Sequence, residues 1–260
     1  MILWLKIFRL PVLGMAALLT LQSFKLSGLK TEVSWPLLFI LTTALATMLL
    51  DDWLDRKVLL CRPEKKLAKE RRRIYLSMII IAWVLSLVSA WGCIFKYDYQ
   101  ALYGVLPMIL IGIGYSLFRR IPLMSAVIVA TVWAVIAIFP VVIGLAPLAP
   151  APALLGGLVF AIVLCRELLN DLRDYQIDCG VKKTMPQIFS YDFTVFFLIA
   201  ATLVYEVVLF LISFWLLPTA VASALAMYIL VKSDNAVGAK NTLDVGLAYG
   251  LLIFLFLGTT

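Results

Sequence analysis

At residues 167–178 the chain reads Glu-Leu-Leu-Asn-Asp-Leu-Arg-Asp-Tyr-Gln-Ile-Asp, close behind the apolar run Leu-Val-Phe-Ala-Ile-Val-Leu at 158–164. If the run continues as a helix, Asp171, Asp174 and Asp178 share one face, because residues three and four apart on a helix are neighbours. Carboxylates on one stripe repel each other unless a cation lies against them. A solvated surface helix would tolerate the stripe, but it rarely follows so apolar a run. We therefore interpret this stretch as a functional site at a membrane edge.

A second copy of this pattern occurs earlier in the chain. Residues 49–55 and 168–174 both read Leu-Leu-x-Asp-x-x-Asp, and each copy follows an apolar run and precedes a basic, proline-containing tail. Such a repeat predicts two similar halves that face one site. Two acidic clusters with basic tails suit a polyphosphate bridged by Mg²⁺. A few carboxylates and the phosphate oxygens hold the metal, while Lys and Arg take the remaining phosphate charge.

The composition indicates a protein that crosses the membrane several times. Hydrophobic residues make up 64% of the chain, against about half in soluble domains. We predict an all-α membrane protein with about nine transmembrane helices in one bundle and two pseudo-repeated halves, residues 1–260 forming a single domain. Several expected helices are shorter than the ~20 residues of an ideal span. The nine apolar segments cover residues 7–24, 35–50, 74–95, 101–118, 121–145, 153–169, 193–215, 217–231 and 243–258.

The distribution of Lys and Arg predicts the orientation. With the N-terminus in the cytosol, 19 of the 22 basic residues fall in cytosolic segments, and only Lys25, Lys30 and Lys96 fall outside. Cytosolic loops carry the excess of Lys and Arg in membrane proteins, so both aspartate stretches are expected to face the cytosol. The net charge of +7 is consistent with this bias and requires no nucleic-acid partner.

Two residue types exclude other kinds of chemistry. The chain has no histidine, which removes His-based acid–base catalysis and argues against a zinc or haem site. Its cysteines lack C-x-x-C spacing, so we expect reduced thiols or core residues; they are Cys61, Cys93, Cys165 and Cys179.

The aspartate stretches resemble the UbiA superfamily of intramembrane prenyltransferases, whose hallmark is two aspartate-rich motifs on cytosolic loops. The second motif is similar to residues 166–178 and is the most specific part of the likeness. The family's Tyr-Ser…Lys/Arg-Arg-x-Pro segment is similar to residues 114–122, Gly-Tyr-Ser-Leu-Phe-Arg-Arg-Ile-Pro. The first motif is matched by Asp51, Asp52, Asp55, Arg62 and Pro63.

The chain departs from the family at two positions. Asp51 stands where family members usually have Asn, and Leu59 stands where they usually have Asp. Compared with the family pattern, the first motif therefore lacks the carboxylate at position 59 and has an additional one at position 51.

The resemblance implies a Mg²⁺-dependent enzyme that moves a prenyl group from an allylic prenyl diphosphate to an acceptor, usually an aromatic ring, and releases pyrophosphate. It implies catalytic and metal-binding roles for Asp52, Asp55, Asp171, Asp174 and Asp178. Diphosphate contacts are expected from Asp51, Asn170, Arg62, Arg119, Arg120, Lys182 and Lys183. Tyr115 and Glu206 are candidates for the acceptor pocket, although Glu206, in the middle of an apolar segment, could equally be a neutral packing residue.

Two other functions fit parts of the sequence. A terpene cyclase of the same superfamily would use the same ionisation without an acceptor, and Asp51 gives the first motif the D-D-x-x-D pattern of soluble terpene synthases. A transporter would place polar groups and broken helices near the membrane midplane, whereas here the acids lie at helix ends. We expect a transferase that is embedded in the lipid bilayer and acts on a prenyl diphosphate and a small aromatic or other nucleophilic acceptor.

Overall fold

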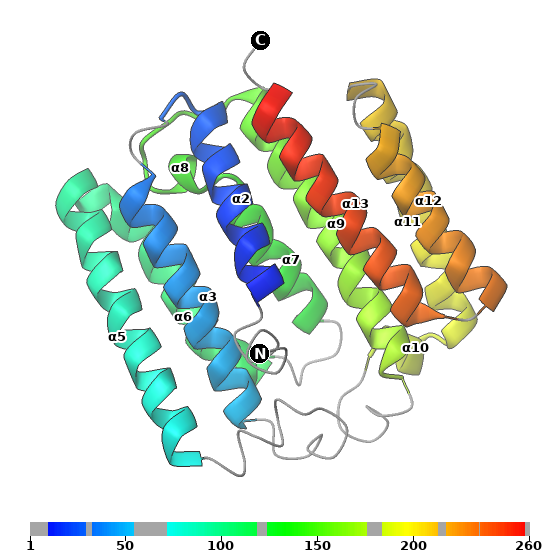
Figure 1. The fold of residues 1–260 in the computed structure, drawn as a ribbon, viewed down its shortest axis with the longest axis horizontal. Helices are drawn as coiled ribbons and strands as arrows, with labels where there is room; N and C mark the ends of the chain where they lie inside the picture. The colour runs from blue at the N-terminus through cyan, green and yellow to red at the C-terminus, as the bar shows by residue number, and fades with distance from the viewer. Residues whose placement is uncertain are drawn as a thin grey trace. The chain divides into compact units, whose positions relative to one another are not determined.

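The computed structural model describes residues 10–29, 33–54, 72–118, 124–175, 184–212, 217–233 and 235–257. Within these residues the chain is helical and contains no strand (Figure 1), which confirms the all-α prediction. Contacts between Cα atoms divide the chain into two compact units. Unit 1 comprises Met1–Phe118 and Val135–Ala153, and unit 2 comprises Arg119–Ala134 and Leu154–Thr260.

Unit 1 is built around the pair α3 and α5. Its helices are α2 (Leu10–Leu26), α3 (Ser34–Leu54), α5 (Arg72–Tyr97), the 3₁₀ turn η2 (Tyr99–Ala101), α6 (Leu102–Phe118) and the short α8 (Phe139–Val142). Small and large side chains alternate in the α3–α5 core, where Ala46 and Leu49 pack with Tyr75, Ile79 and Ala82.

Polar and small residues also tie the helices of unit 1 together. The hydroxyls of Thr43 on α3 and Ser86 on α5 share a buried hydrogen bond of 2.6 Å. Gly112 allows α6 to approach α3, because a Cβ there would lie 2.6 Å from Thr47 Oγ1. Buried hydrogen bonds and small residues are the usual means of helix association in a bilayer, where apolar side chains gain little by leaving lipid.

Unit 2 contains the helix that carries the second aspartate motif. Its helices are most of α7 (Met124–Ala137), most of α9 (Pro150–Arg173), the short α10 (Met185–Ile188), α11 (Tyr191–Ile212), α12 (Leu217–Ser233) and α13 (Ala236–Leu257), and α13 runs beside α9 (Figure 1). The backbone of α13 approaches α12 closely where Gly246 meets Ala222 and Gly250 meets Thr219. These glycines are four residues apart, a spacing that brings membrane helices together.

The fifth apolar segment differs from its prediction. Residues 121–145 were expected to form one helix, but α7 (Met124–Ala137) ends before Ile138 and α8 begins at Phe139. Pro140 explains the break, because it has no N–H to donate and its ring clashes with a preceding helical turn.

Among the described residues, four helices are long and apolar enough to cross a membrane: Ser34–Leu54, Arg72–Tyr97, Pro150–Arg173 and Tyr191–Val208. Helix α5 also exposes a continuous set of apolar side chains, among them Ile80, Val84, Leu87 and Trp91. Water does not favour so large an apolar surface, but lipid does. The protein is therefore an integral membrane protein.

Candidate functional site

The first aspartate motif lies in the last turn of α3. Asp52 is 1% exposed, whereas Asp51 is partly exposed. The hydroxyl of Tyr75, on α5, donates a hydrogen bond to Asp52 Oδ2 over 3.4 Å. A buried carboxylate needs such a donor or a positive charge to remain ionised. Among the described residues of the first motif, Asp52 is thus a buried carboxylate that a side chain of α5 contacts.

The ends of α3 and α5 meet next to this carboxylate. The guanidinium of Arg72 lies 5.2 Å from the centre of the Trp53 ring, a cation–π distance that favours the pairing of the two helix ends. Tyr115, the acceptor-pocket candidate of unit 1, lies in the last turn of α6 and is partly buried. Four site residues predicted from the sequence lie outside the described residues, namely Asp55, Arg62, Arg119 and Arg120, and so does Leu59.

The second aspartate motif lies at the end of α9. Asp171 is 4% exposed and Asp174 is 9% exposed. The backbone N–H of Asp174 donates to the carbonyl of Asn170 over 2.9 Å, so helical hydrogen bonding continues past Arg173 to Asp174. Asn170, Asp171 and Asp174 therefore lie close together at the end of the helix. This confirms that Asp171 and Asp174 share a helical face, as their spacing predicts. Asp178, Lys182 and Lys183 lie outside the described residues.

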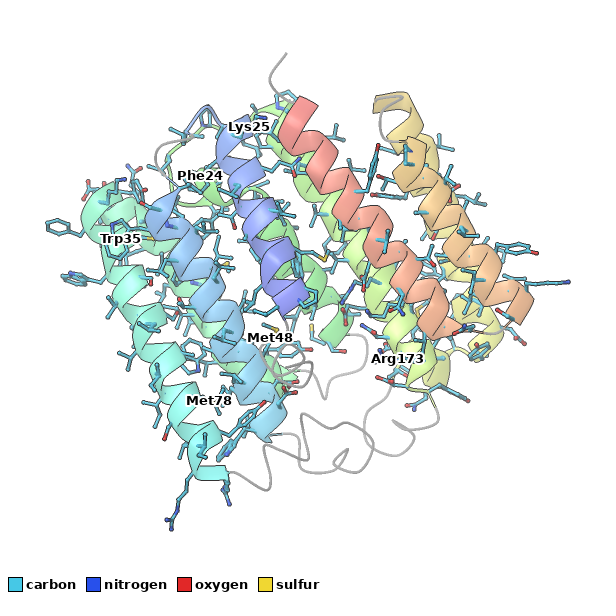
Figure 2. The ribbon with its side chains drawn as sticks, in the orientation of Figure 1. Phe24, Lys25, Trp35, Met48, Met78 and Arg173 are labelled. Carbon is cyan, nitrogen blue, oxygen red and sulfur yellow. The ribbon has the colours of Figure 1, made fainter. Side chains whose placement is uncertain are left out.

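Arg173, within the second motif, forms an ion pair with Asp174, the last carboxylate of the motif among the described residues. Arg173, labelled at the end of α9 in Figure 2, donates from Nε to Asp174 Oδ1 and from Nη2 to Asp174 Oδ2, both over 2.7 Å. Two parallel hydrogen bonds between a guanidinium and a carboxylate form the strongest common ion-pair geometry. Arg173 lies within the predicted motif, but no role was predicted for it.

A network of four charged groups lies one turn before the motif. Arg166 donates from Nε to Asp244 Oδ1 of α13 over 2.6 Å and from Nη1 to Glu167 Oε1 over 2.5 Å. Lys240 donates to the other oxygen of Asp244 over 2.6 Å. Two positive and two negative charges thus balance each other between α9 and α13. A charge inside an apolar helix requires a partner of this kind.

This network was not predicted, although one feature of the sequence indicates it. Lys240 and Asp244 are four residues apart, the spacing of a helical ion pair, and they directly precede an apolar run. The ninth apolar segment was expected to begin at 243, whereas α13 begins at Ala236. Lys240 was therefore assigned to a loop instead of a helix.

The chain beyond the motif returns to the end of α9. Gln187 on α10 donates from Nε2 to the carbonyl of Tyr175 over 3.4 Å, and its Oε1 accepts from the Thr184 N–H over 3.2 Å. The rings of Tyr175 and Tyr191 lie 6.1 Å apart in an edge-on arrangement. These contacts hold the end of α9 against the start of α11.

Glu206 has a described partner within unit 2. Ser223 on α12 donates to Glu206 Oε1 over 3.1 Å. This hydrogen bond between α11 and α12 agrees with the interpretation of Glu206 as a packing residue. The alternative role in an acceptor pocket stays a prediction.

The donor atoms at the end of α9 fit a hard divalent cation. Mg²⁺ prefers oxygen ligands and usually binds a few carboxylates together with substrate phosphates. Asp171 and Asp174 supply carboxylates, and Asn170 Oδ1 is buried without a hydrogen-bond partner in the described part of the chain. The described part of the chain contains no group of three or more Asp, Glu, Cys or His side chains placed to hold a metal. Substrate oxygens or residues outside the described ranges would complete a coordination shell here.

Comparison with known proteins identifies one family. The model of the UbiA prenyltransferase family matches residues 10–257, nearly the whole chain. No curated protein and no solved structure matches the chain. The match includes α3 with the first aspartate motif and α9 with the second.

Proposed function

The chain belongs to the UbiA prenyltransferase family, whose members are intramembrane prenyltransferases, and on this premise we propose a Mg²⁺-dependent transfer of a prenyl group from an allylic prenyl diphosphate to an aromatic acceptor. One observation supports the head-group site most directly. Two buried carboxylates, Asp171 and Asp174, lie at the end of the apolar helix α9, beside the Asn170 amide oxygen, which has no hydrogen-bond partner among the described residues. An apolar helix with a polar end suits a substrate that has an apolar chain and a charged head.

We assign the metal-binding carboxylates to Asp52, Asp55, Asp171, Asp174 and Asp178. When bound, Mg²⁺ would stabilise the negative charge that develops on the departing pyrophosphate. Asn170 would bind and orient the head group through its amide. The remaining diphosphate contacts are proposed for Asp51, through a bridging cation, and for the basic residues Arg62, Arg119, Arg120, Lys182 and Lys183.

The reaction breaks one bond and forms another. The allylic C–O bond breaks, and its electron pair leaves with pyrophosphate. The aromatic acceptor then attacks the allyl cation and afterwards loses a proton. The apolar side chains of the protein would keep water away from the cation, and their aromatic rings could stabilise it by cation–π contact. Tyr115 and Glu206 remain candidates for the acceptor pocket.

We further propose that the nine apolar segments all cross the bilayer as one domain and that both motifs face the cytosol. The charge distribution supports this, because 19 of 22 basic residues fall on the predicted cytosolic side. Prenyl diphosphates are anionic, so a basic cytosolic surface would attract them.

Purified protein tests the function directly. It would be incubated with prenyl diphosphates of several chain lengths and a panel of aromatic acceptors, with Mg²⁺ or with EDTA. We expect pyrophosphate release and a prenylated acceptor, detected by mass spectrometry, only with Mg²⁺. Absence of pyrophosphate release with every substrate would contradict the proposed function and favour a transporter.

One observation favours a second candidate. Asp51 gives the first motif the sequence D-D-x-x-D, which it shares with terpene synthases. A terpene cyclase would release pyrophosphate without an acceptor and form a cyclic product. The same assay distinguishes the two enzymes when the acceptor is omitted.

A further inference from the structure

The ion pair between Arg173 and Asp174 occupies a carboxylate that the proposed reaction needs. Both oxygens of Asp174 accept a hydrogen bond from Arg173, each over 2.7 Å. The Arg173 side chain is 27% exposed, so it is accessible to a ligand that approaches the end of α9. A cation that coordinates Asp174 must compete with this guanidinium for at least one oxygen.

Helix geometry does not impose this pair. Consecutive residues on a helix point in different directions and do not normally face each other. Asp174 also follows directly after Arg173, the last residue of α9. The two side chains therefore meet by electrostatic attraction at a helix end, and a competing charge can separate them without disturbing the helix.

The pair reduces a repulsion within the motif. Asp171 and Asp174 are both buried and lie one helical turn apart. Two negative charges at this spacing destabilise each other, and a nearby arginine offsets part of that cost. In the substrate-free protein, Arg173 thus performs for Asp174 the neutralising role that a divalent cation would perform in the loaded enzyme.

We propose that Arg173 is an exchangeable counter-ion. It neutralises Asp174 until a divalent cation takes over that carboxylate, and the released guanidinium then binds the substrate diphosphate. The inference rests on the proposed function. A guanidinium fork matches phosphate oxygens as well as carboxylate oxygens, so Nε and Nη2 serve both partners in turn. No covalent bond changes in this exchange.

Loss of the guanidinium should change the affinities for the two ligands in opposite directions. Without Arg173, a cation no longer competes with this guanidinium for Asp174 and should bind more tightly. A diphosphate, in contrast, loses a charged donor and should bind more weakly. Loss of a residue that only maintains the fold would weaken the binding of both ligands. Opposite changes in the two affinities therefore distinguish the proposed exchange from a structural role.

The test compares wild type with Arg173→Gln, Arg173→Lys and the control Lys232→Gln. Lys232 is an exposed basic residue of the same unit, in the last turn of α12, and has no proposed role. Binding of Mn²⁺ alone to the substrate-free protein would be measured by the electron paramagnetic resonance of free Mn²⁺, since Mn²⁺ accepts the same oxygen ligands as Mg²⁺. Binding of inorganic pyrophosphate would be measured by calorimetry with saturating Mg²⁺.

We expect Arg173→Gln to bind Mn²⁺ about fivefold more tightly and pyrophosphate about tenfold more weakly. Arg173→Lys should keep part of the pyrophosphate affinity, because it retains the charge but loses the fork. Lys232→Gln should match wild type in both. The inference is wrong if Mn²⁺ and pyrophosphate affinities fall together, or if either one stays at the wild-type value.

Failure of the inference is distinguishable from failure of the function. Wild-type protein that releases pyrophosphate from a prenyl diphosphate, paired with an Arg173→Gln variant that lacks the opposite changes, overturns the exchange alone. Wild-type protein that binds neither Mn²⁺ nor pyrophosphate and releases none contradicts both the exchange and the proposed function.

Discussion

At the scale of single residues, Asp171 and Asp174 should be indispensable. Both are buried at the end of α9, and a lost metal ligand removes stabilisation of the leaving group that neighbouring side chains do not replace. Asp171→Ala and Asp174→Ala should each lower turnover by about 100-fold or more, measured as pyrophosphate release. Asp192→Ala, which removes an exposed acid from the first turn of α11, is the matched control. Full activity of Asp171→Ala would contradict the prediction and show that the head-group site lies elsewhere.

A second prediction at this scale concerns Leu59. It stands where related enzymes usually carry an aspartate, so Leu59→Asp restores a carboxylate to the first motif. We expect the variant to remain active and to reach half-maximal activity at a lower Mg²⁺ concentration, because an added carboxylate strengthens a magnesium site. A Mg²⁺ titration of the initial rate measures this. Loss of activity would show that the first motif has no place for another carboxylate there.

At the scale of helices, the link between α9 and α13 should stabilise unit 2. Asp244→Asn leaves Arg166 and Lys240 without their shared carboxylate, and an unpaired charge in an apolar setting is costly. Since these side chains are 14–25% exposed, we expect a loss of about 1–3 kcal/mol. Thermal unfolding in detergent would show it as a lower midpoint.

Replacing the whole network separates its charges from the packing of the helices. A variant with Arg166→Met, Glu167→Gln, Lys240→Met and Asp244→Leu leaves none of the four charges unpaired and should cost less than Asp244→Asn alone. Equal unfolding midpoints for wild type and Asp244→Asn would contradict a stabilising role.

The helices could be predicted from the sequence because their apolar runs are long and local. Asp171 and Asp174 were also assigned to one face by spacing alone. The contact between Arg166 and Asp244 could not be predicted, because the two residues are 78 apart in the chain and no local pattern specifies which helices pair. The pairing of Arg173 with Asp174 was missed for the opposite reason, since adjacent residues on a helix are expected to point apart.

The break at Ile138 is a further limit of apolar patterning. Hydrophobicity continues from 121 to 145, so the pattern predicts one helix, whereas Pro140 requires a new start. Proline alone does not locate such a boundary, because Pro107 lies inside the continuous helix α6.

At the scale of the whole molecule, both motifs should be accessible from the same side of the membrane. Single cysteines at Arg72 and Tyr175, exposed positions near the first and second motifs, would be introduced after the native cysteines are replaced. We expect both to react with an impermeant thiol reagent from the cytosolic side. Lys96→Cys, at the opposite end of the helix that Arg72 begins, should react only from the other side. Opposite labelling of positions 72 and 175 would exclude a site shared by the two motifs.

The timing of ionisation also belongs to the whole molecule, since it requires the apolar bundle, the head-group site and the acceptor together. An allyl cation that forms before the acceptor binds would react with water to give a prenyl alcohol. A transferase therefore avoids this loss if ionisation of the prenyl diphosphate occurs only after the acceptor has bound. We therefore predict that pyrophosphate release requires Mg²⁺ and rises sharply when a suitable aromatic acceptor is added. A cyclase needs no second substrate, and its release would be complete with prenyl diphosphate alone. Asp51 is the residue that keeps this alternative open, because it completes the D-D-x-x-D pattern. A cyclic product formed without acceptor, identified by mass spectrometry, would overturn the assignment as a transferase.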